Sequence, residues 1–274
     1  MLCFPNCKIN LGLYVTRRRE DGYHDLETVF FPVNFHDSLE VVPAMETSLH
    51  LSGLKVGSNT QENLVWKAYE MLSARYPGKV PPLNIFLHKA IPMGAGLGGG
   101  SADGAFMLRL LNDFCNLGID KPTLAAMALE LGSDCPFFIY NTPQMATGRG
   151  EVMTPIAIDL AGYSLQLICP KVHVSTRDAF GMMTPREAPF DLRHLGTLPV
   201  ERWKGSVSND FEHTVFKVHP VLADIKQQLY DQGAIYASMS GSGSTMFGIF
   251  RKGQRAQITA DVAFKDVYIE QATI

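Results

Sequence analysis

The sequence predicts an α+β protein with antiparallel sheets, and three observations lead to this class. The 274 residues are 46% hydrophobic and 19% charged, a composition typical of a globular protein with a buried core rather than a disordered chain. Strand patterns fill the beginning of the chain and return in its second half. Helical patterns lie between them without regular alternation, which disfavours a doubly wound parallel sheet.

The beginning of the chain is predicted to be mostly β-structure. Apolar and β-forming residues predict a strand over 2–15, followed by a charged turn over 17–22. Further strands are expected over 28–32 and 38–42. Asn63 is suited to cap a helix that extends to residue 76.

The remaining elements follow in order. A strand over 83–88 leads into a glycine-rich loop, and Ser101 can cap the helix after it. A short helix over 124–131 ends before Gly132, a residue type favoured after helix C-termini. The second half is predicted to contain strands over 144–147, 152–156 and 163–169, a connection over 183–199, helices over 211–218 and 221–230, strands over 234–239 and 245–250, and a closing helix over 256–264 with a strand over 267–270.

Composition also limits the functional class. The net charge of −3, without a basic stripe, argues against a nucleic-acid partner. No apolar stretch reaches the roughly 18 residues of a membrane span, and no signal peptide is recognisable. The cysteines are odd in number and form no CxxC pair, and no zinc-binding histidine motif is present. We therefore expect a cytoplasmic protein with reduced thiols and no structural zinc.

The segment 92–103 is the strongest chemical signal. It reads Pro92-Met93-Gly94-Ala95-Gly96-Leu97-Gly98-Gly99-Gly100-Ser101-Ala102-Asp103. Glycines allow the backbone to approach a ligand closely, and the following helix adds unpaired N–H groups and the positive end of its dipole. The pattern therefore predicts a binding site for a phosphate chain.

Other glycine loops fit this segment less well. A P-loop requires a lysine after the glycines, and none follows. The Rossmann spacing matches at Gly94, Gly96 and Gly99, with Asp120 downstream, but Pro92 interrupts the strand and repeated βαβ units are missing. A protein-kinase glycine loop is followed by a strand, whereas this one precedes a helical pattern. A flexible surface turn is the remaining alternative.

Three segments in order resemble the motifs of the GHMP kinases. The central one is Pro92-x-x-x-Gly96-Leu97-Gly98-Gly99-Gly100-Ser101-Ala102, where many relatives carry a second serine. Pro5-x-x-Lys8-Ile9-Asn10-Leu11 resembles the first motif, and Ser240-Gly241-Ser242-Gly243-Ser244 the third. The resemblance implies a two-lobed fold, with a ribosomal-protein-like amino-terminal lobe and a ferredoxin-like carboxy-terminal lobe. We place the lobes at 1–150 and 151–274, where strands resume.

Further segments narrow the resemblance. Arg18-Arg19-x-Asp21-Gly22-Tyr23-His24-x-Leu26, Gly132-Ser133-Asp134-Cys135-Pro136-Phe137-Phe138 and Ala146-Thr147-Gly148-x-Gly150-Glu151 are similar to the 4-diphosphocytidyl-2-C-methyl-D-erythritol kinase family of the non-mevalonate isoprenoid pathway. The family phosphorylates the 2-hydroxyl of its substrate with ATP and Mg²⁺. One serine fewer near the loop leaves the magnesium ligands open, with Ser101 as a candidate.

Two residues are expected to carry the reaction. A carboxylate at Asp134 can accept the proton of a substrate hydroxyl, although Asp before Cys-Pro also suits an N-cap. Lys8 lies in an apolar strand and therefore needs a partner, unless it is a surface lysine on an edge strand. The resemblance favours catalysis, with Lys8 paired to Asp134.

The resemblance also assigns binding residues. The glycine segment, Lys89 and Asn63 would lie near ATP, although Asn63 is equally suited to a plain N-cap. Tyr23 and His24 would bind cytosine, with Phe180 on its other face. The alternatives are core packing for Tyr23, a surface residue with satisfied hydrogen bonds for His24, and no binding role for Phe180. Asn10 would contact substrate or close a turn. Gly241, Ser242 and Gly243 would surround the substrate phosphates or form a tight turn.

Other functions remain alternatives at this point. A homoserine or mevalonate-type kinase would share the three motifs but not the segment Asp21-Gly22-Tyr23-His24. A catalytically silent regulator would not need both Lys8 and Asp134. An RNA-binding module is disfavoured by the acidic balance. We expect a small-molecule substrate and a monomer or homodimer, without nucleic-acid or membrane partners.

Overall fold

The computed structural model describes residues 1–55 and 60–270, and the chain forms two compact units. The first unit contains Met1–Lys8, Phe35–Met93 and Gly98–Thr142. The second contains Ile9–Asn34, Gly94–Leu97 and the described chain from Pro143 onward. Because the chain passes repeatedly from one unit to the other, no single boundary near residue 150 separates them.

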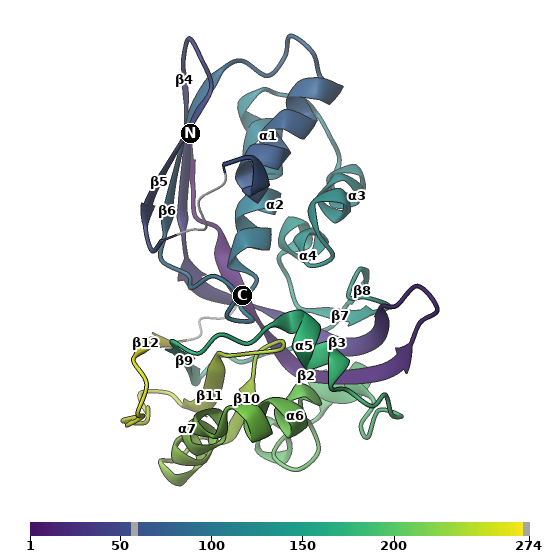
Figure 1. Ribbon diagram of the computed structural model, residues 1–274, viewed down its shortest axis with the longest axis vertical. Helices are drawn as coiled ribbons and strands as arrows, with labels where there is room; N and C mark the ends of the chain where they lie inside the picture. Colours follow the sequence, from purple (N-terminus) through teal and green to yellow (C-terminus); the bar gives the residue numbers. More distant parts are fainter. Residues whose placement is uncertain (56–59, 271–274) are drawn as a thin grey trace. The chain divides into compact units, whose positions relative to one another are not determined.

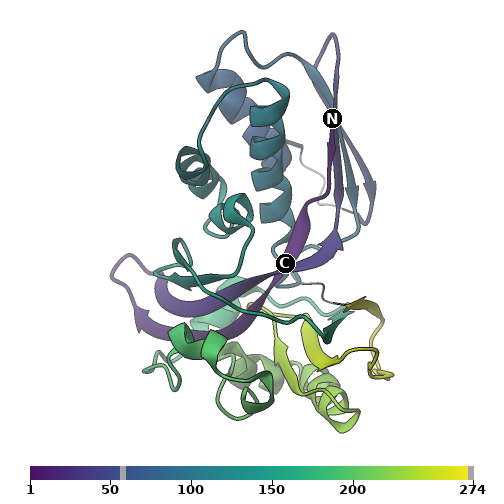
Figure 2. The ribbon, with the colours of Figure 1, turned by 180° about the vertical axis from the view of Figure 1, so that it is seen from behind.

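The first unit is a sheet covered by helices on one side, as Figures 1 and 2 show. The strand order is β1-β4-β6-β5, with β5 parallel to β6 and the other pairs antiparallel. Alternate residues of the central strands, among them Val41, Ile85 and Leu87, are buried. Its elements are β1 (Leu2–Cys3), β4 (Ser38–Pro43), β5 (Ser48–Gly53), η1 (Thr60–Glu62), α1 (Leu64–Arg75), β6 (Leu83–Lys89), α2 (Gly99–Phe114), α3 (Lys121–Leu131) and α4 (Cys135–Tyr140).

The second unit contains most of one antiparallel sheet and all of another. The first has the order β2-β3-β7-β8, and the second the order β10-β11-β9-β12. Numbered along the chain from β9, the second order is 4-1-3-2 from its far edge, as in ferredoxin-like folds. The elements are β2 (Asn6–Arg18), β3 (His24–His36), β7 (Gln144–Thr147), β8 (Val152–Pro155), β9 (Tyr163–Pro170), α5 (Thr176–Gly181), η2 (Leu192–Thr197), η3 (Val200–Arg202), α6 (Phe211–Val218), α7 (Pro220–Asp231), β10 (Tyr236–Met239), β11 (Met246–Arg251) and β12 (Phe264–Glu270).

The ferredoxin-like sheet is covered by α6 and α7, which lie beside it in Figure 1. Their apolar residues form one core with strand residues, including Phe211 and Ile225 from the helices and Met239 and Phe250 from the strands. The predicted fold class is thereby confirmed as a mixture of helices and sheets, and β5–β6 is a parallel pair in sheets that are otherwise antiparallel.

The predicted helix over 256–264 is wrong, because this segment is extended irregular chain until β12 begins at Phe264. Ala256 and Ile258 are both buried, a spacing of two that suits an extended segment rather than a helix. The backbone of this segment forms hydrogen bonds with glutamine side chains instead of helical bonds. Gln166 bonds the N–H and carbonyl of Ala256, and Gln228 bonds those of Thr259.

Smaller differences occur elsewhere. The strand expected over 2–15 is two strands, interrupted at Phe4–Pro5, since proline has no N–H to donate to a ladder. Strand β5 and helix α5 were not predicted. Strand β5 lacks the clean alternation of a half-buried strand, since most of its residues are exposed.

Candidate active site

Helix α2 begins at the end of the glycine segment, inside the first unit. Gly98 is its N-cap, with a positive φ of 70° and no side-chain capping bond. Its carbonyl accepts the N–H of Ala102 at 2.8 Å. Ser101 therefore lies within the first turn and is not the cap predicted from the sequence, because a left-handed glycine starts the helix three residues earlier. Without a side-chain cap, the first turn retains N–H groups suited to an anion.

The Lys8 side chain packs against Gly98, at the start of α2. A Cβ at Gly98 would meet the Lys8 side chain at 3.2 Å and Phe138 at 3.0 Å, so only glycine allows this approach. The Lys8 side chain is 4% exposed and its Nζ lies 3.7 Å from Oδ2 of Asp134, whose side chain is 37% exposed. Burial lowers the pKa of Lys8, and the charge of Asp134 opposes that shift.

Asp134 occupies the position before α4, yet its side chain makes no capping hydrogen bond. The N-cap alternative for this residue is therefore wrong. The predicted pairing of Lys8 with Asp134 is present as an ion pair. A half-exposed carboxylate beside a buried cation can receive a proton from a bound hydroxyl.

A second lysine is buried close to the same helix. Lys89, the last residue of β6, is bonded through Nζ to Oδ2 of Asp37 and, at 2.6 Å, to Oδ2 of Asp103. Burial raises the pKa of Asp103 to about 8, while Lys89 opposes the shift and Asp37 adds to it. The ammonium group is fully buried and bonded to two carboxylates. That Lys89 lies near the nucleotide stays a prediction.

Asn63 has the capping role that sequence reasoning left open. Its Oδ1 accepts the N–H of Val65 at 2.9 Å, at the start of α1. Asp120, which matches the Rossmann spacing, likewise caps α3 through the N–H of Thr123 at 2.8 Å. Nucleotide contacts by Asn63 and Pro92 stay predictions.

The other half of the glycine segment, Gly94–Leu97, belongs to the second unit. There a Cβ on Gly96 would overlap the carbonyl oxygen of Ser240, and Ser240 Oγ donates to the carbonyl of Gly96 at 2.8 Å. The N–H of Thr245 donates to the carbonyl of Ala95 at 3.2 Å. The first half of the central motif is thus joined to the third motif, although the two are far apart in the sequence.

The third motif is a turn between β10 and β11 whose backbone accepts hydrogen bonds from a buried side chain. Gly241 and Gly243 have positive φ angles of 57° and 94°, as glycine permits. Buried Asn209 donates to the carbonyls of Met239 and Gly241 at 2.7 and 2.8 Å. Ser242 Oγ lies 3.1 Å from Thr176 Oγ1. Sequence reasoning missed Asn209, which belongs to no quoted motif.

Asn10 is buried inside β2 and does not close a turn. Its Nδ2 donates to Thr28 Oγ1 at 2.9 Å, and its Oδ1 lies 3.5 Å from Ser240 Oγ, whose shorter bond is to the carbonyl of Gly96. The amide therefore lies beside the turn of the third motif. Direct contact with substrate stays a prediction.

The hairpin between β2 and β3 presents the residues predicted to bind a base. Tyr23 is 57% exposed, and the Arg149 guanidinium lies 5.1 Å from its ring centroid. The rings of His24 and Phe180 stack on each other, with centroids 5.1 Å apart and an angle of 20°. Their direct contact leaves no space for a base between these two rings. Burial lowers the pKa of His24, and Arg18 adds to this shift.

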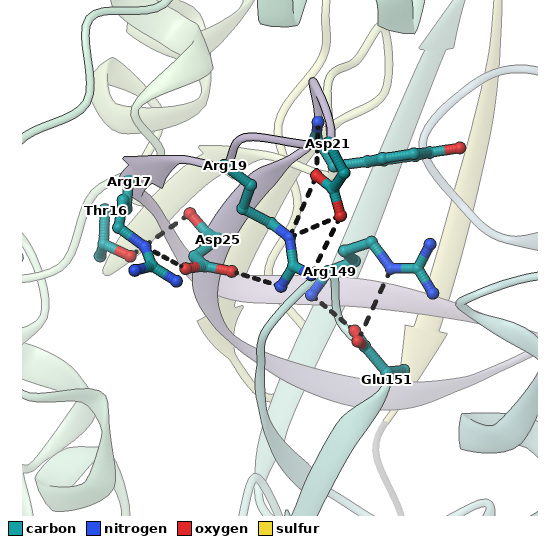
Figure 3. A network of polar contacts seen from close by, with 8 residues as sticks. Thr16, Arg17, Arg19, Asp21, Asp25, Arg149 and Glu151 are labelled. Carbon is teal, nitrogen blue, oxygen red and sulfur yellow. Dashed lines mark hydrogen bonds and ion pairs between the residues drawn. The ribbon is translucent and has the colours of Figure 1, made fainter.

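Ion pairs fix the shape of this hairpin, as Figure 3 shows. Asp25 accepts from Arg17 at 2.7 Å and from Arg19 at 3.1 Å. Arg19 also pairs with Asp21 at 3.0 Å. On the adjoining turn, Glu151 accepts the backbone N–H of Arg149 at 2.5 Å. These contacts lie on both sides of the Tyr23 ring, and their exposure limits what each adds to stability.

The described chain shows neither a cluster of metal ligands nor a membrane span. Within residues 1–55 and 60–270, no group of three or more His, Cys, Asp or Glu side chains is placed to hold a metal ion. No helix of this part of the chain is both long and apolar enough to cross a membrane. None of the five cysteines, all of which lie within the described residues, forms a disulfide bond.

Comparison with known proteins agrees with these features. Residues 63–142 match the model of the GHMP kinases N terminal domain, and residues 201–267 that of the GHMP kinases C terminal domain. A 4-diphosphocytidyl-2-C-methyl-D-erythritol kinase from Parabacteroides distasonis is 52% identical over 252 residues, covering 92% of each chain. One from Bacteroides fragilis is 49% identical over 254 residues, covering 91% of this chain and 92% of its own.

Solved structures agree as well. A crystal structure of 4-(cytidine 5'-diphospho)-2C-methyl-D-erythritol kinase is similar with a TM-score of 0.74 and 33% identity, covering 91% of this chain and 90% of its own. A homoserine kinase from Cytophaga hutchinsonii, 16% identical with a TM-score of 0.66, covers 98% of this chain and 95% of its own and shares the fold alone. The family resemblance is thereby confirmed: the chain belongs to the GHMP kinases and, within them, to the 4-diphosphocytidyl-2-C-methyl-D-erythritol kinase family.

Proposed function

We propose that this protein transfers the γ-phosphoryl group of ATP to the 2-hydroxyl of 4-diphosphocytidyl-2-C-methyl-D-erythritol, a step of non-mevalonate isoprenoid biosynthesis. The observation that carries the proposal is the Lys8–Asp134 pair, which lies in the same unit as the uncapped start of α2. Identity of 52% to a relative with this name supports the choice of substrate over homoserine or mevalonate.

Asp134 is proposed to act as the general base. The substrate oxygen attacks the γ-phosphorus, the bond to the bridging oxygen of ADP breaks, and the hydroxyl proton passes to the Asp134 carboxylate. The buried Lys8 cation, 3.7 Å from that carboxylate, would stabilise negative charge on the attacking oxygen. A silent regulator would have no use for this costly buried charge.

The start of α2 is proposed to hold the phosphates of ATP. The uncapped N–H groups of the first turn and the helix dipole both favour negative charge there. Mg²⁺ prefers oxygen ligands and keeps several waters, so ATP and water would supply most of its ligands. Ser101 is the candidate ligand from the chain, and the ion would neutralise charge that develops on the phosphates.

The second unit is proposed to bind the cytidylyl part of the substrate. Tyr23 offers an exposed ring on the hairpin between β2 and β3, with Arg149 against it. His24 offers its ring edge to the base. For Phe180 to form the second face, the observed His24–Phe180 stack would have to open. Gly241, Ser242 and Gly243 are proposed to surround substrate phosphates, with the N–H groups of Gly241 and Ser242 as donors, because the N–H of Gly243 donates to the carbonyl of Ser240 at 3.0 Å.

The proposed substrates also support a location and a set of partners for the enzyme. A small, charged, phosphorylated substrate and ATP are cytoplasmic metabolites, which supports a cytoplasmic enzyme, acting as a monomer or homodimer. Neither a nucleic acid nor a membrane is needed as a partner.

The proposal is tested by measuring ADP release from purified protein with ATP and Mg²⁺. Three acceptors are compared: the cytidylyl substrate, homoserine and mevalonate. Turnover with the first alone is the expected result. Turnover with either of the others would leave the fold assignment intact and overturn the substrate, and silence with all three would overturn the proposed enzyme activity.

A further inference from the structure

Three ionisable side chains are buried together beside the first turn of α2. Lys89 ends β6, Asp37 lies between β3 and β4, and Asp103 is in the first turns of α2. The side chains of Lys89 and Asp37 are 0% exposed and that of Asp103 is 4% exposed. All three belong to the first unit, and none of them reaches solvent.

The cluster joins three segments that are distant in the sequence. Lys89 Nζ bonds one oxygen of Asp37 and, at 2.6 Å, one oxygen of Asp103. The second oxygen of Asp37 accepts the N–H groups of Ala90 and Ile91 at 2.6 and 2.9 Å. Residues Ala90 and Ile91 precede the glycine segment, and helix α2 follows it. Both are therefore bonded to the cluster of Lys89, Asp37 and Asp103.

The helix start also packs directly on this cluster. A Cβ on Gly99 would lie 2.8 Å from Ile91 Cγ2 and 3.4 Å from Lys89 Nζ. Glycine at position 99 thus permits the first turn to rest against the ammonium group and its neighbour. Any shift of Lys89 or Asp103 would move the N–H groups of this turn.

Stability alone does not account for such a cluster. Apolar side chains of similar volume often replace buried ion clusters without loss of stability, because charges are costly to remove from water. Directional bonds, in contrast, hold a backbone in one place more narrowly than apolar contacts do. Donors that bind a phosphoryl group must be fixed before the ligand arrives, and an error of about 1 Å can cost about 100-fold in rate.

We propose that Lys89, Asp37 and Asp103 are positioning residues that fix the first turn of α2 for the phosphates of ATP without touching the nucleotide. This inference rests on the proposed function, in which that turn binds ATP. Asp103 ends the glycine-rich segment and has no role in the proposed mechanism, and the inference gives it one. It also replaces direct nucleotide contact as the role of the Lys89 side chain.

The test compares Asp103→Ala with Asp103→Asn. The alanine variant loses the bond to Lys89, whereas the asparagine oxygen can still accept it. We expect Asp103→Ala to raise both the KM and the Kd for ATP about tenfold or more, with less than about a twofold change in the KM for the alcohol substrate. Asp103→Asn should restore the ATP values to within about twofold of wild type.

Leu72→Ala is the matched control for simple destabilisation. Leu72 is a fully buried residue of α1 in the same unit, and its truncation should cost about 2–5 kcal/mol of stability. It should lower the Tm and leave the KM for ATP unchanged. If Asp103→Ala behaves like Leu72→Ala, with a lower Tm and an unchanged KM for ATP, the positioning role is overturned.

A second variant and the wild type complete the test. If Asp103→Ala does not fold, the triple variant Asp37→Asn/Lys89→Met/Asp103→Leu removes all three ionisable groups, while the asparagine oxygen can still accept the N–H groups of Ala90 and Ile91. It should fold and still bind ATP about tenfold or more weakly, and wild-type affinity in it would overturn the inference. Absence of ATP binding by the wild type would instead overturn the proposed function, and the inference with it.

Discussion

Lys8 and Asp134 form one ion pair but differ greatly in their access to water. Lys8 is almost completely buried, while Asp134 keeps more than a third of its side-chain surface. A buried cation beside a carboxylate that solvent can reach is a poor arrangement for stability and a useful one for proton transfer. The chemistry of the proposed reaction therefore depends on a residue that the fold accommodates at a cost.

Replacing Lys8 by Met should separate these two effects. Methionine has a similar volume and no charge to desolvate, and Asp134 remains partly hydrated without its partner. We expect an unchanged or higher Tm together with a fall in kcat of about 100-fold or more. Thermal unfolding and steady-state kinetics measure the two quantities. A large fall in Tm with nearly normal kcat would mean that Lys8 is structural.

At the scale of elements, the central motif is built from two kinds of glycine. Gly94 has a φ of 64°, and a Cβ added there would meet no atom within 4 Å. Gly96 has a φ of 79° and lies against the carbonyl of Ser240. Conformation alone requires the first glycine. The second is required by conformation and by close backbone packing as well.

Alanine substitutions at these glycines should therefore differ in effect. Gly94→Ala carries only the left-handed backbone penalty of about 1–2 kcal/mol. Gly96→Ala adds a clash with backbone that cannot move aside easily, so we expect a greater loss of stability and of ATP affinity. Denaturant unfolding and the KM for ATP give the comparison. Equal effects of the two substitutions would argue against the close approach to Ser240.

Prediction from sequence succeeded where the signal was local. The cap at Asn63, the helix after the glycines and the ferredoxin-like lobe implied by the family resemblance were all foreseen. The segment 256–264 was wrongly predicted to be a helix, although its apolar residues stand at every second position. Its hydrogen bonds come from glutamines in other elements, which no local pattern reveals.

The candidate site was likewise foreseen in part. The pairing of Lys8 with Asp134 followed from the family resemblance and from the need of a buried lysine for a partner. The partners of Lys89 were not foreseen, because Asp37 lies 52 residues away and Asp103 lies 14 residues away. Asn209 was missed because its role is to hold carbonyls of a distant turn.

At the scale of the whole molecule, the buried cluster links folding to pH. The pKa of Asp103 rises on folding from the ordinary 3.8 to about 8, chiefly through burial. The folded protein therefore binds a proton that the unfolded chain has already released between these values. The stability from this group is fully present below about pH 4 and is lost as the pH rises to about 8.

Asp103→Asn makes this dependence measurable, because asparagine does not titrate. The free energy of unfolding of the wild type, minus that of the variant, should fall between pH 5 and pH 8. The slope is at most about 1.4 kcal/mol per pH unit for one proton. Denaturant unfolding at several pH values gives this difference. A difference that is constant or rises with pH would show that Asp103 is ionised in the folded protein.

The central claim is that Asp134 removes the hydroxyl proton during phosphoryl transfer. The most direct test is the rate of ADP formation in a single turnover, with wild type and Asp134→Asn both saturated with ATP, Mg²⁺ and the cytidylyl substrate. We predict a rate about 10²–10⁴-fold lower in the variant, with the Tm and the Kd for ATP nearly unchanged. A variant that transfers the phosphoryl group at the wild-type rate would contradict the account.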